Sequence, residues 1–338
     1  MTDQPRWNEP VLRPTNVKRQ HYVPRVYLRP FVGQDDNIRV VDLDTGSEYR
    51  TSIENAAVET YFNDLEVEGL RVSTEDWLAE LEGKAASVIK QLTMSPETIG
   101  GLSLEEELAL ARFIAALKFR TPGFREWKTK VTSPIISQIK EILRAQLYHQ
   151  YDRKEADATW EIWKDKPDYW WLGQEAPEQP AEGTTYMLGE VQGFANLLRA
   201  APWRIGRAAG SLRLYTSDNP VSAYLSPVRP WWDGGAFSSF AYYLSLAPDV
   251  LLKIDRRPYK DEQGDSLAPQ GERRYGDFSD WEVSFAQHVI TKDATRFLYG
   301  EALVVPRDCA TDCLERIGQA NLQIAMRYQG FDPKPPAH

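Results

Sequence analysis

The sequence has few cysteines and histidines and no long apolar run. Only two cysteines, Cys309 and Cys313, occur in 338 residues, which excludes a small scaffold held together by disulfides. No run approaches the roughly 18 consecutive apolar residues of a membrane helix, and the N-terminal stretch MTDQPRWNEPVLRPT lacks the apolar segment of a secretory signal. We therefore predict a cytoplasmic protein that makes no contact with membranes.

Short catalytic signatures are also missing. The chain contains no GxxxxGK, GxGxxG, GxSxG or HExxH motif, so the enzyme families defined by those motifs are not indicated. No histidine or further cysteine lies near Cys309 and Cys313, so we predict no metal site there. No residue identifies a cofactor, which stays unknown.

The charge is unevenly distributed. Forty basic against 49 acidic side chains give a net charge of -9, the wrong sign for a protein that grips duplex nucleic acid. Yet no acid occurs between Glu9 and Asp35, or between Glu190 and Asp218. A third basic segment, Lys118 to Lys130, contains one acid. These three basic windows indicate a small anionic ligand or nucleotide, whereas a protein partner stays unknown.

Hydrophobic periodicity predicts several helices and short strands. The segment 37–50 has two strand-like halves around a turn at 44–46. Helices are predicted over 73–92, over 103–121 behind a capping box, over 124–151 with Pro134 as a kink or a new start, and over 185–200. Strands are predicted up to Ser217, over 240–248 and over 299–306; further helices are predicted over 280–297 and from Asp308.

These elements predict an α+β fold, predominantly helical, with a small sheet built from short strands of the N-terminal region and the C-terminal half. We expect a flexible N-terminus over 1–16, a single domain over 17–330 that includes a helical subregion at 73–165, and a flexible tail over 331–338.

Three motifs carry a family resemblance. They are HYVPRVYLRPF from His21, KFRTP with Arg120, and TSDNPV with Asp218. Together they resemble the uncharacterised bacterial domain-of-unknown-function family numbered forty-two thirty-eight, over roughly His21 to Tyr328. The resemblance implies no activity. One departure is Gln287, beside His288, where the family leads us to expect an asparagine.

The same motifs supply the candidate site residues. His21 can serve as a base or an acid at cellular pH, or it can be structural, anchoring an aromatic cluster through a backbone hydrogen bond. Asp218 is a lone carboxylate among arginines, or it holds an Asx turn. Arg120 either binds a phosphate or carboxylate through two N–H groups of its guanidinium, or it is a cation that stabilises a helix C-terminus. Tyr27 packs in the core or forms a stacking wall.

We predict a hydrolase-like enzyme that acts on a small or nucleotide-like anion, with His21 as base or acid and Asp218 as its orienting group or as a metal ligand. The substrate-binding residues are predicted to be Arg25, Tyr27, Arg120, Arg213, Ser217 and Asn219. A non-catalytic ligand-sensing or protein-interaction module is the alternative. A nuclease is a further one, although the sequence shows no acidic metal cluster, and no metal ligand is assigned.

Overall fold

Helices and short strands alternate along the chain in the computed structural model, which describes residues 13–14, 17–67, 70–166, 171, 182–224, 241–255 and 271–301. The predicted α+β class, with helix predominant, is confirmed. No described helix is long and apolar enough to cross a membrane. Cys309, Cys313 and the helix predicted from Asp308 lie outside the described residues.

Three helices form the centre of the molecule: α2 (Glu75–Met94), α3 (Leu104–Phe119) and α7 (Glu182–Ala200). The predicted apolar face of α2 is buried, including Leu78, Leu81 and Leu92, because residues three and four apart share one side of a helix. The predicted capping box of α3 is present, with Ser103 Oγ accepting from Glu106 N. A short 3-10 helix, η2 (Pro96–Gly101), follows α2.

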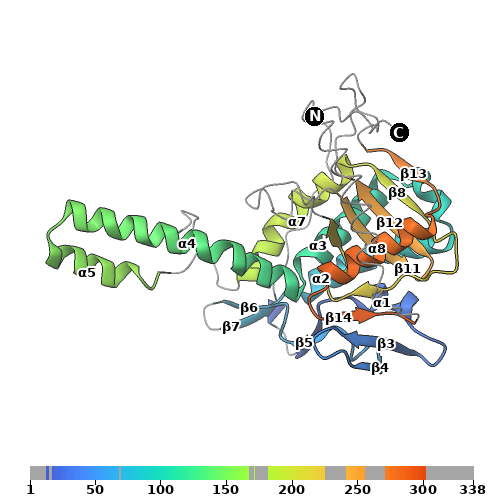
Figure 1. The fold of residues 1–338 in the computed structure, drawn as a ribbon, viewed down its shortest axis with the longest axis horizontal. Coiled ribbons are helices and arrows are strands. Elements are labelled where there is room, and N and C mark those ends of the chain that lie inside the picture. Colours follow the sequence, from blue (N-terminus) through green and yellow to red (C-terminus); the bar gives the residue numbers. More distant parts are fainter. Residues whose placement is uncertain are drawn as a thin grey trace, which may run out of the picture.

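A five-stranded sheet lies against these helices, in the order β10-β11-β12-β8-β13. Its strands are β8 (Trp203–Arg207), β10 (Ser222–Tyr224), β11 (Ala241–Ala247), β12 (Val250–Asp255) and β13 (Arg273–Tyr275). Every residue of β11 is buried. Tyr242 and Leu244 pack into the main core, whereas Tyr243 packs with Val283 of α8 (Asp280–Asp293). The sheet is therefore covered on both faces, with α8 across one of them (Figure 1).

A four-stranded sheet joins the two ends of the described chain, in the order β4-β3-β14-β9. Its strands are β3 (Asn37–Asp42), β4 (Glu48–Ser52), β9 (Thr216–Ser217) and β14 (Phe297–Tyr299). The predicted hairpin of β3 and β4 is confirmed, and Gly46 adopts φ 68° in its turn, a conformation that glycine adopts without strain. This sheet combines N-terminal and C-terminal strands, as predicted.

The His-Tyr-Val-Pro motif leads from a strand into the core. β2 (Arg19–His21) pairs with β5 (Val58–Thr60), and α1 (Arg25–Leu28) and the 3-10 helix η1 (Arg29–Phe31) follow. A third small sheet consists of β1 (Arg13–Pro14), β7 (Leu70–Ser73) and β6 (Asp64–Val67). Tyr22, Tyr27, Leu28 and Phe31 are buried, so the aromatic residues of the motif supply packing area.

Two helices extend away from the rest of the chain as a hairpin (Figure 1): α4 (Pro122–Gln150) and α5 (Arg153–Trp163). α4 is continuous through position 134, so the helix does not restart there. Pro122 stops α3 as predicted but also begins α4, because proline suits the first position of a helix.

Some predicted boundaries were wrong. The helix predicted over 280–297 ends at Asp293, and the strand that follows begins at Phe297 rather than at 299. Strands β8 and β12 were not predicted. Strand β13 was not predicted either.

Candidate functional site

His21 is half-buried and has a defined tautomer. Its Nε2 lies 3.1 Å from the carbonyl oxygen of Ile53, and because a carbonyl can only accept, Nε2 carries the hydrogen. Burial lowers the pKa of His21, and the charges of Arg25 and Arg120 act in the same direction. His21 is therefore neutral at pH 7, with the lone pair on Nδ1, which makes no hydrogen bond within the described residues.

Arg120 is buried beside His21, with an exposed fraction of 3%. It follows the last residue of α3, where its Nε donates to Tyr22 O at 3.1 Å and its Nη1 donates to Glu82 Oε1 at 2.8 Å. Its Nη2 is buried and has no hydrogen-bond partner in the described part of the chain. A buried donor of this kind is costly unless it is paired, so Nη2 can still donate a hydrogen bond.

Two further polar side chains complete this group. Asn63 Nδ2 donates to Glu75 Oε1 at 2.8 Å, and burial raises the pKa of Glu75, as does the charge of Glu82. Asn63 Oδ1 is buried and without a partner in the described chain. We call His21, Asn63, Glu75, Glu82 and Arg120 the His21 cluster. It offers one free acceptor nitrogen, one free guanidinium N–H group and one free amide oxygen.

Asp218 is buried and accepts hydrogen bonds from three backbone N–H groups. Its Oδ1 accepts from Thr295 N at 2.8 Å, and its Oδ2 accepts from Arg296 N at 2.7 Å and Phe297 N at 3.0 Å. Burial raises the pKa of Asp218, and the three N–H groups oppose that change. In the described chain no hydrogen bond joins Asp218 to His21. The carboxylate holds the connection between α8 and β14.

Tyr22 connects the two regions. Its carbonyl oxygen accepts from Arg120, and its hydroxyl lies 3.3 Å from that of Tyr299. Burial raises the pKa of Tyr22, and the charge of Asp218 adds to the effect. His21 and Arg120 therefore lie at the backbone end of Tyr22, whereas Asp218 lies toward its hydroxyl end.

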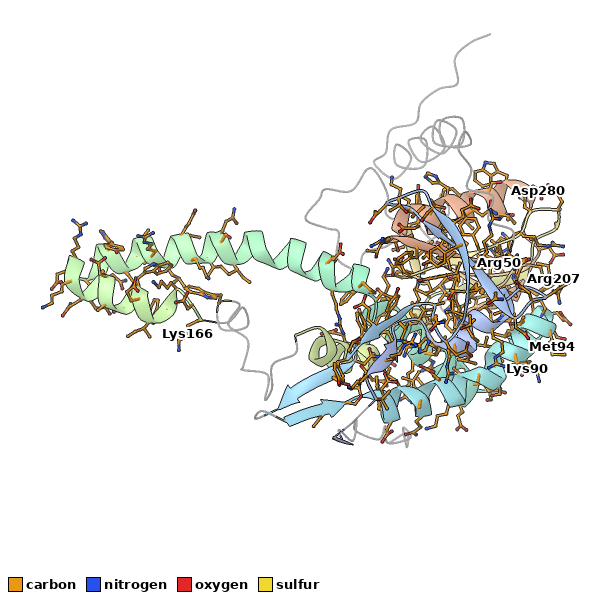
Figure 2. All side chains as sticks on the ribbon, turned by 90° about the horizontal axis from the view of Figure 1, so that it is seen from below. Arg50, Lys90, Met94, Lys166, Arg207 and Asp280 are labelled. Atoms are coloured by element: carbon orange, nitrogen blue, oxygen red, sulfur yellow. The ribbon has the colours of Figure 1, made fainter. Side chains whose placement is uncertain are left out.

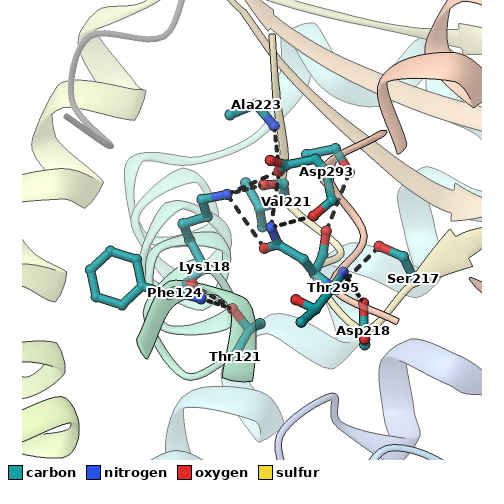
Figure 3. A network of polar contacts seen from close by, with 11 residues as sticks. Lys118, Thr121, Phe124, Ser217, Asp218, Val221, Ala223, Asp293 and Thr295 are labelled. Carbon is teal, nitrogen blue, oxygen red and sulfur yellow. Dashed lines mark hydrogen bonds and ion pairs between the residues drawn. The ribbon is translucent and has the colours of Figure 1, made fainter. Parts of the chain in front are cut away.

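Asn219 belongs to a second buried network (Figure 3). Its Nδ2 donates to Asp293 Oδ2 at 3.0 Å, and Lys118 Nζ reaches Asp293 Oδ2 at 3.2 Å and Val221 O at 2.9 Å. Ser217 Oγ accepts from Asn219 N at 3.1 Å. The side chain of Asn219 thereby links the turn after β9 to α3, through Lys118, and to α8, through Asp293.

The remaining predicted binding residues are distributed between the core and the surface. Tyr27 is fully buried, and its hydroxyl donates to Ser245 O at 2.7 Å. Arg25 is exposed at the start of α1. Arg213 is exposed, and its carbonyl oxygen accepts from Gln287 of α8. The structure thus brings together Arg25, Arg120 and His21 of the predicted set.

Cations of the basic windows pair with acids that are distant in the sequence. Arg204 binds Glu282 at 2.6 Å. Arg207 binds Asp249 at 2.5 Å and donates to the carbonyl oxygen of Met94, beside which it lies in Figure 2. An acid-poor window of sequence is therefore not an acid-poor region of space, because Lys118, Arg120, Arg204 and Arg207 each pair with a carboxylate from elsewhere in the chain.

The sequence profile of one family matches residues 19–301, and that family is described as protein of unknown function (DUF4238). The chain belongs to this family. The match contains every member of the His21 cluster as well as Asp218 and Asn219. No curated protein and no solved structure matches the chain. The family resemblance inferred from the motifs is confirmed, and DUF4238 supplies no activity.

Several residues of the site were missed by the sequence-based prediction. Glu82 lies on α2 with its carboxylate paired to Arg120, and Glu75 is the first residue of α2. Both read as ordinary exposed acids of an amphipathic helix. Asn63 stands in a segment without a clear period, so only the structure relates it to the His-Tyr-Val-Pro motif.

His21 predicts a pH-dependent stability. The pKa of His21 is lowered in the folded protein from its usual 6.5, so the folded state binds fewer protons than the unfolded state below that pH. The stability that neutral His21 contributes is fully present above about pH 6.5. It is lost as the pH falls from there through the lower pKa that His21 has in the folded state. Urea unfolding at pH 7.5 and 5.5 should show the loss, and His21→Gln should reduce it. An unchanged pH dependence in His21→Gln would show that this histidine does not contribute, leaving His288, whose pKa is also lowered, by burial.

Proposed function

We propose that the protein is a hydrolase-like enzyme that acts on a small anionic substrate at the His21 cluster. The observation that carries the proposal is the pairing of a neutral histidine, which has a free Nδ1, with a buried guanidinium that has a free Nη2. Hydrolysis requires a general base that is unprotonated near pH 7, and it is helped by a hydrogen-bond donor held in place to stabilise negative charge on the substrate. The cytoplasm is the proposed compartment.

Each residue has a separate proposed role. Arg120 Nη2 donates to the anionic group of the substrate, while Glu82 on Nη1 fixes the guanidinium plane. Exposed Arg25 adds positive potential at the edge of the cluster. Because Glu82 already neutralises much of the charge of Arg120, a substrate with one negative charge fits better than a polyphosphate. Asp218 positions the α8–β14 connection instead of orienting His21.

The proposed reaction uses water as the nucleophile. His21 Nδ1 accepts a proton from the water, whose oxygen forms the new bond to the electrophilic carbon or phosphorus. The bond to the leaving group breaks, and the leaving group takes the proton from Nδ1. Ile53 O holds Nε2–H throughout, which keeps the ring orientation fixed.

Activity assays with a substrate panel test this function. We expect hydrolysis of at least one of a set of nitrophenyl phosphate monoesters, phosphate diesters and carboxylate-bearing esters. His21→Gln should lower kcat/KM by about 10²- to 10⁴-fold, the usual contribution of a general base. His149→Gln, which changes an exposed histidine on α4, is the matched control. Equal activity in His21→Gln and the wild type would contradict the proposal.

A protein-interaction module is the second candidate, because of the projecting α4–α5 hairpin. Its exposed large apolar side chains include Ile142, Tyr148, Tyr151 and Ile162, and exposed aromatic residues are enriched at interfaces. A nuclease has no comparable support: in the described ranges no three histidine, cysteine or acidic side chains are grouped as metal ligands.

A further inference from the structure

Asn63 carries a buried acceptor whose identity is fixed by its neighbours. Its exposed fraction is 1%, and its Nδ2 donates to Glu75 Oε1 at 2.8 Å and to His21 O at 3.4 Å. Because a backbone carbonyl oxygen can only accept, the amide nitrogen must occupy this position and the amide oxygen the other. Oδ1 is therefore held as an acceptor, and no donor in the described part of the chain binds it.

Asn63 and Arg120 are held to neighbouring peptide units of the His-Tyr-Val-Pro motif. Asn63 Nδ2 donates to His21 O, and Arg120 Nε donates to Tyr22 O; the Cα atoms of consecutive residues are about 3.8 Å apart. Both side chains also lie around Glu75, since burial raises the pKa of this carboxyl and the charge of Arg120 opposes the rise. Yet Arg120 Nη2 and Asn63 Oδ1 do not bond to each other, because each lacks a partner among the described residues.

An unpaired donor and an unpaired acceptor in one cluster restrict the ligand that fits. A buried polar atom is costly unless it is bonded. A simple carboxylate offers only acceptors, so it pairs with Arg120 Nη2 and leaves Asn63 Oδ1 unpaired. A ligand that also carries an O–H or N–H group satisfies both atoms. His21 Nδ1 is a further free acceptor, but the proposed hydrolysis uses it to activate water.

We propose that Asn63 selects substrates in which a hydroxyl or amide N–H group stands next to the singly charged anionic group, as in a 2-hydroxy carboxylate. The anionic oxygen accepts from Arg120 Nη2, and the neighbouring O–H or N–H group donates to Asn63 Oδ1. A site that binds such a donor rejects an analogue without it, because the buried acceptor is then left unpaired. This inference rests on the anion site of the proposed function, but ligand binding tests it without any hydrolysis.

Three small monoanions are the probes, applied to the full chain: glycolate, methoxyacetate and acetate. Only glycolate has an O–H donor, whereas methoxyacetate keeps the second oxygen without its hydrogen. We expect the Kd of glycolate to be lower than that of either other acid by about tenfold or more, because glycolate alone pairs the buried acceptor. An NMR titration of the Asn63 side chain measures the Kd, and glycolate alone should shift the ¹³C resonance of Cγ, whose oxygen accepts the bond.

Two variants separate selection from anion binding, with the Kd values measured by calorimetry. Asn63→Ala should bind glycolate and methoxyacetate equally, even if both bind more weakly than to the wild type. Arg120→Gln should weaken all three acids by about tenfold or more, as the loss of a charged hydrogen bond does. The control is Asn196→Ala, which changes an exposed asparagine on α7 and should keep the full preference. If Asn63→Ala does not fold, the wild-type Kd values and the Cγ shift decide.

Equal Kd values of glycolate and methoxyacetate in the wild type would overturn the proposal. So would a preference that survives in Asn63→Ala, or no binding of any of the three acids. A preference for glycolate without hydrolysis of any ester would support the selection by Asn63 while the proposed function fails. Hydrolysis that depends on His21, without that preference, would leave the proposed function intact and overturn the selection.

Discussion

Asp218→Ala is expected to lower the free energy of unfolding by about 3–5 kcal/mol, because it leaves three N–H groups, at residues 295, 296 and 297, without their acceptor. Asp218→Asn should have a smaller effect, since its amide oxygen keeps part of the bonding while its NH₂ faces a donor. Urea unfolding of both variants measures the difference.

The control for this prediction is Asp165→Ala, an exposed aspartate after α5, which should change stability by less than about 0.5 kcal/mol. If Asp218→Ala unfolds like the control but loses activity, the carboxylate acts in catalysis and its structural assignment here is incorrect.

Lys118→Met is expected to be the next most damaging change, at about 2–4 kcal/mol. It removes a nearly buried ammonium from Asp293 Oδ2 and from Val221 O, which leaves polar groups of a buried pair uncompensated. We place the value below the full range for buried pairs because the Asp293 side chain is 28% exposed. The measurement is again equilibrium unfolding.

Two comparisons separate pairing from packing. Lys84→Met removes an exposed lysine that is paired with Glu80, and it should cost at most about 0.5 kcal/mol. Adding Asp293→Asn to Lys118→Met should cost less than the sum of the two single changes, because both remove one interaction. Additive effects in the double variant would contradict the ion pair.

Local signals account for the parts of the fold that the sequence predicts. The capping box at Ser103, the apolar spacing of α2 and the turn at Gly46 act within a few residues, so the pattern is enough. β8 and β12 were missed because their residues are neighbours only in the sheet, where Leu252 lies opposite Ile205. Because the two paired strands are distant in the sequence, their pairing leaves no hydrophobic period within either segment that would indicate a strand.

The same distinction applies to the site. The motifs identified His21 and Arg120, whose relation the structure supports through their electrostatic interaction and the bond to Tyr22 O. Asp218 stood out because its sequence neighbours are basic, but the groups that it contacts are backbone amides 77 to 79 residues away. Glu82 could not be paired with Arg120 from spacing, since the contact joins two helices across 38 residues.

The central claim, that His21 is a neutral base beside an anion-binding arginine, is tested most directly by ¹⁵N NMR of the His21 ring during a pH titration. The structure predicts the Nε2–H tautomer at pH 7.5 and a pKa below 6.5. A singly charged anion such as formate should raise that pKa when it occupies Arg120 Nη2, and the rise should disappear in Arg120→Gln. A ring protonated on Nδ1 at pH 7.5, or a pKa that no anion changes, would contradict the claim.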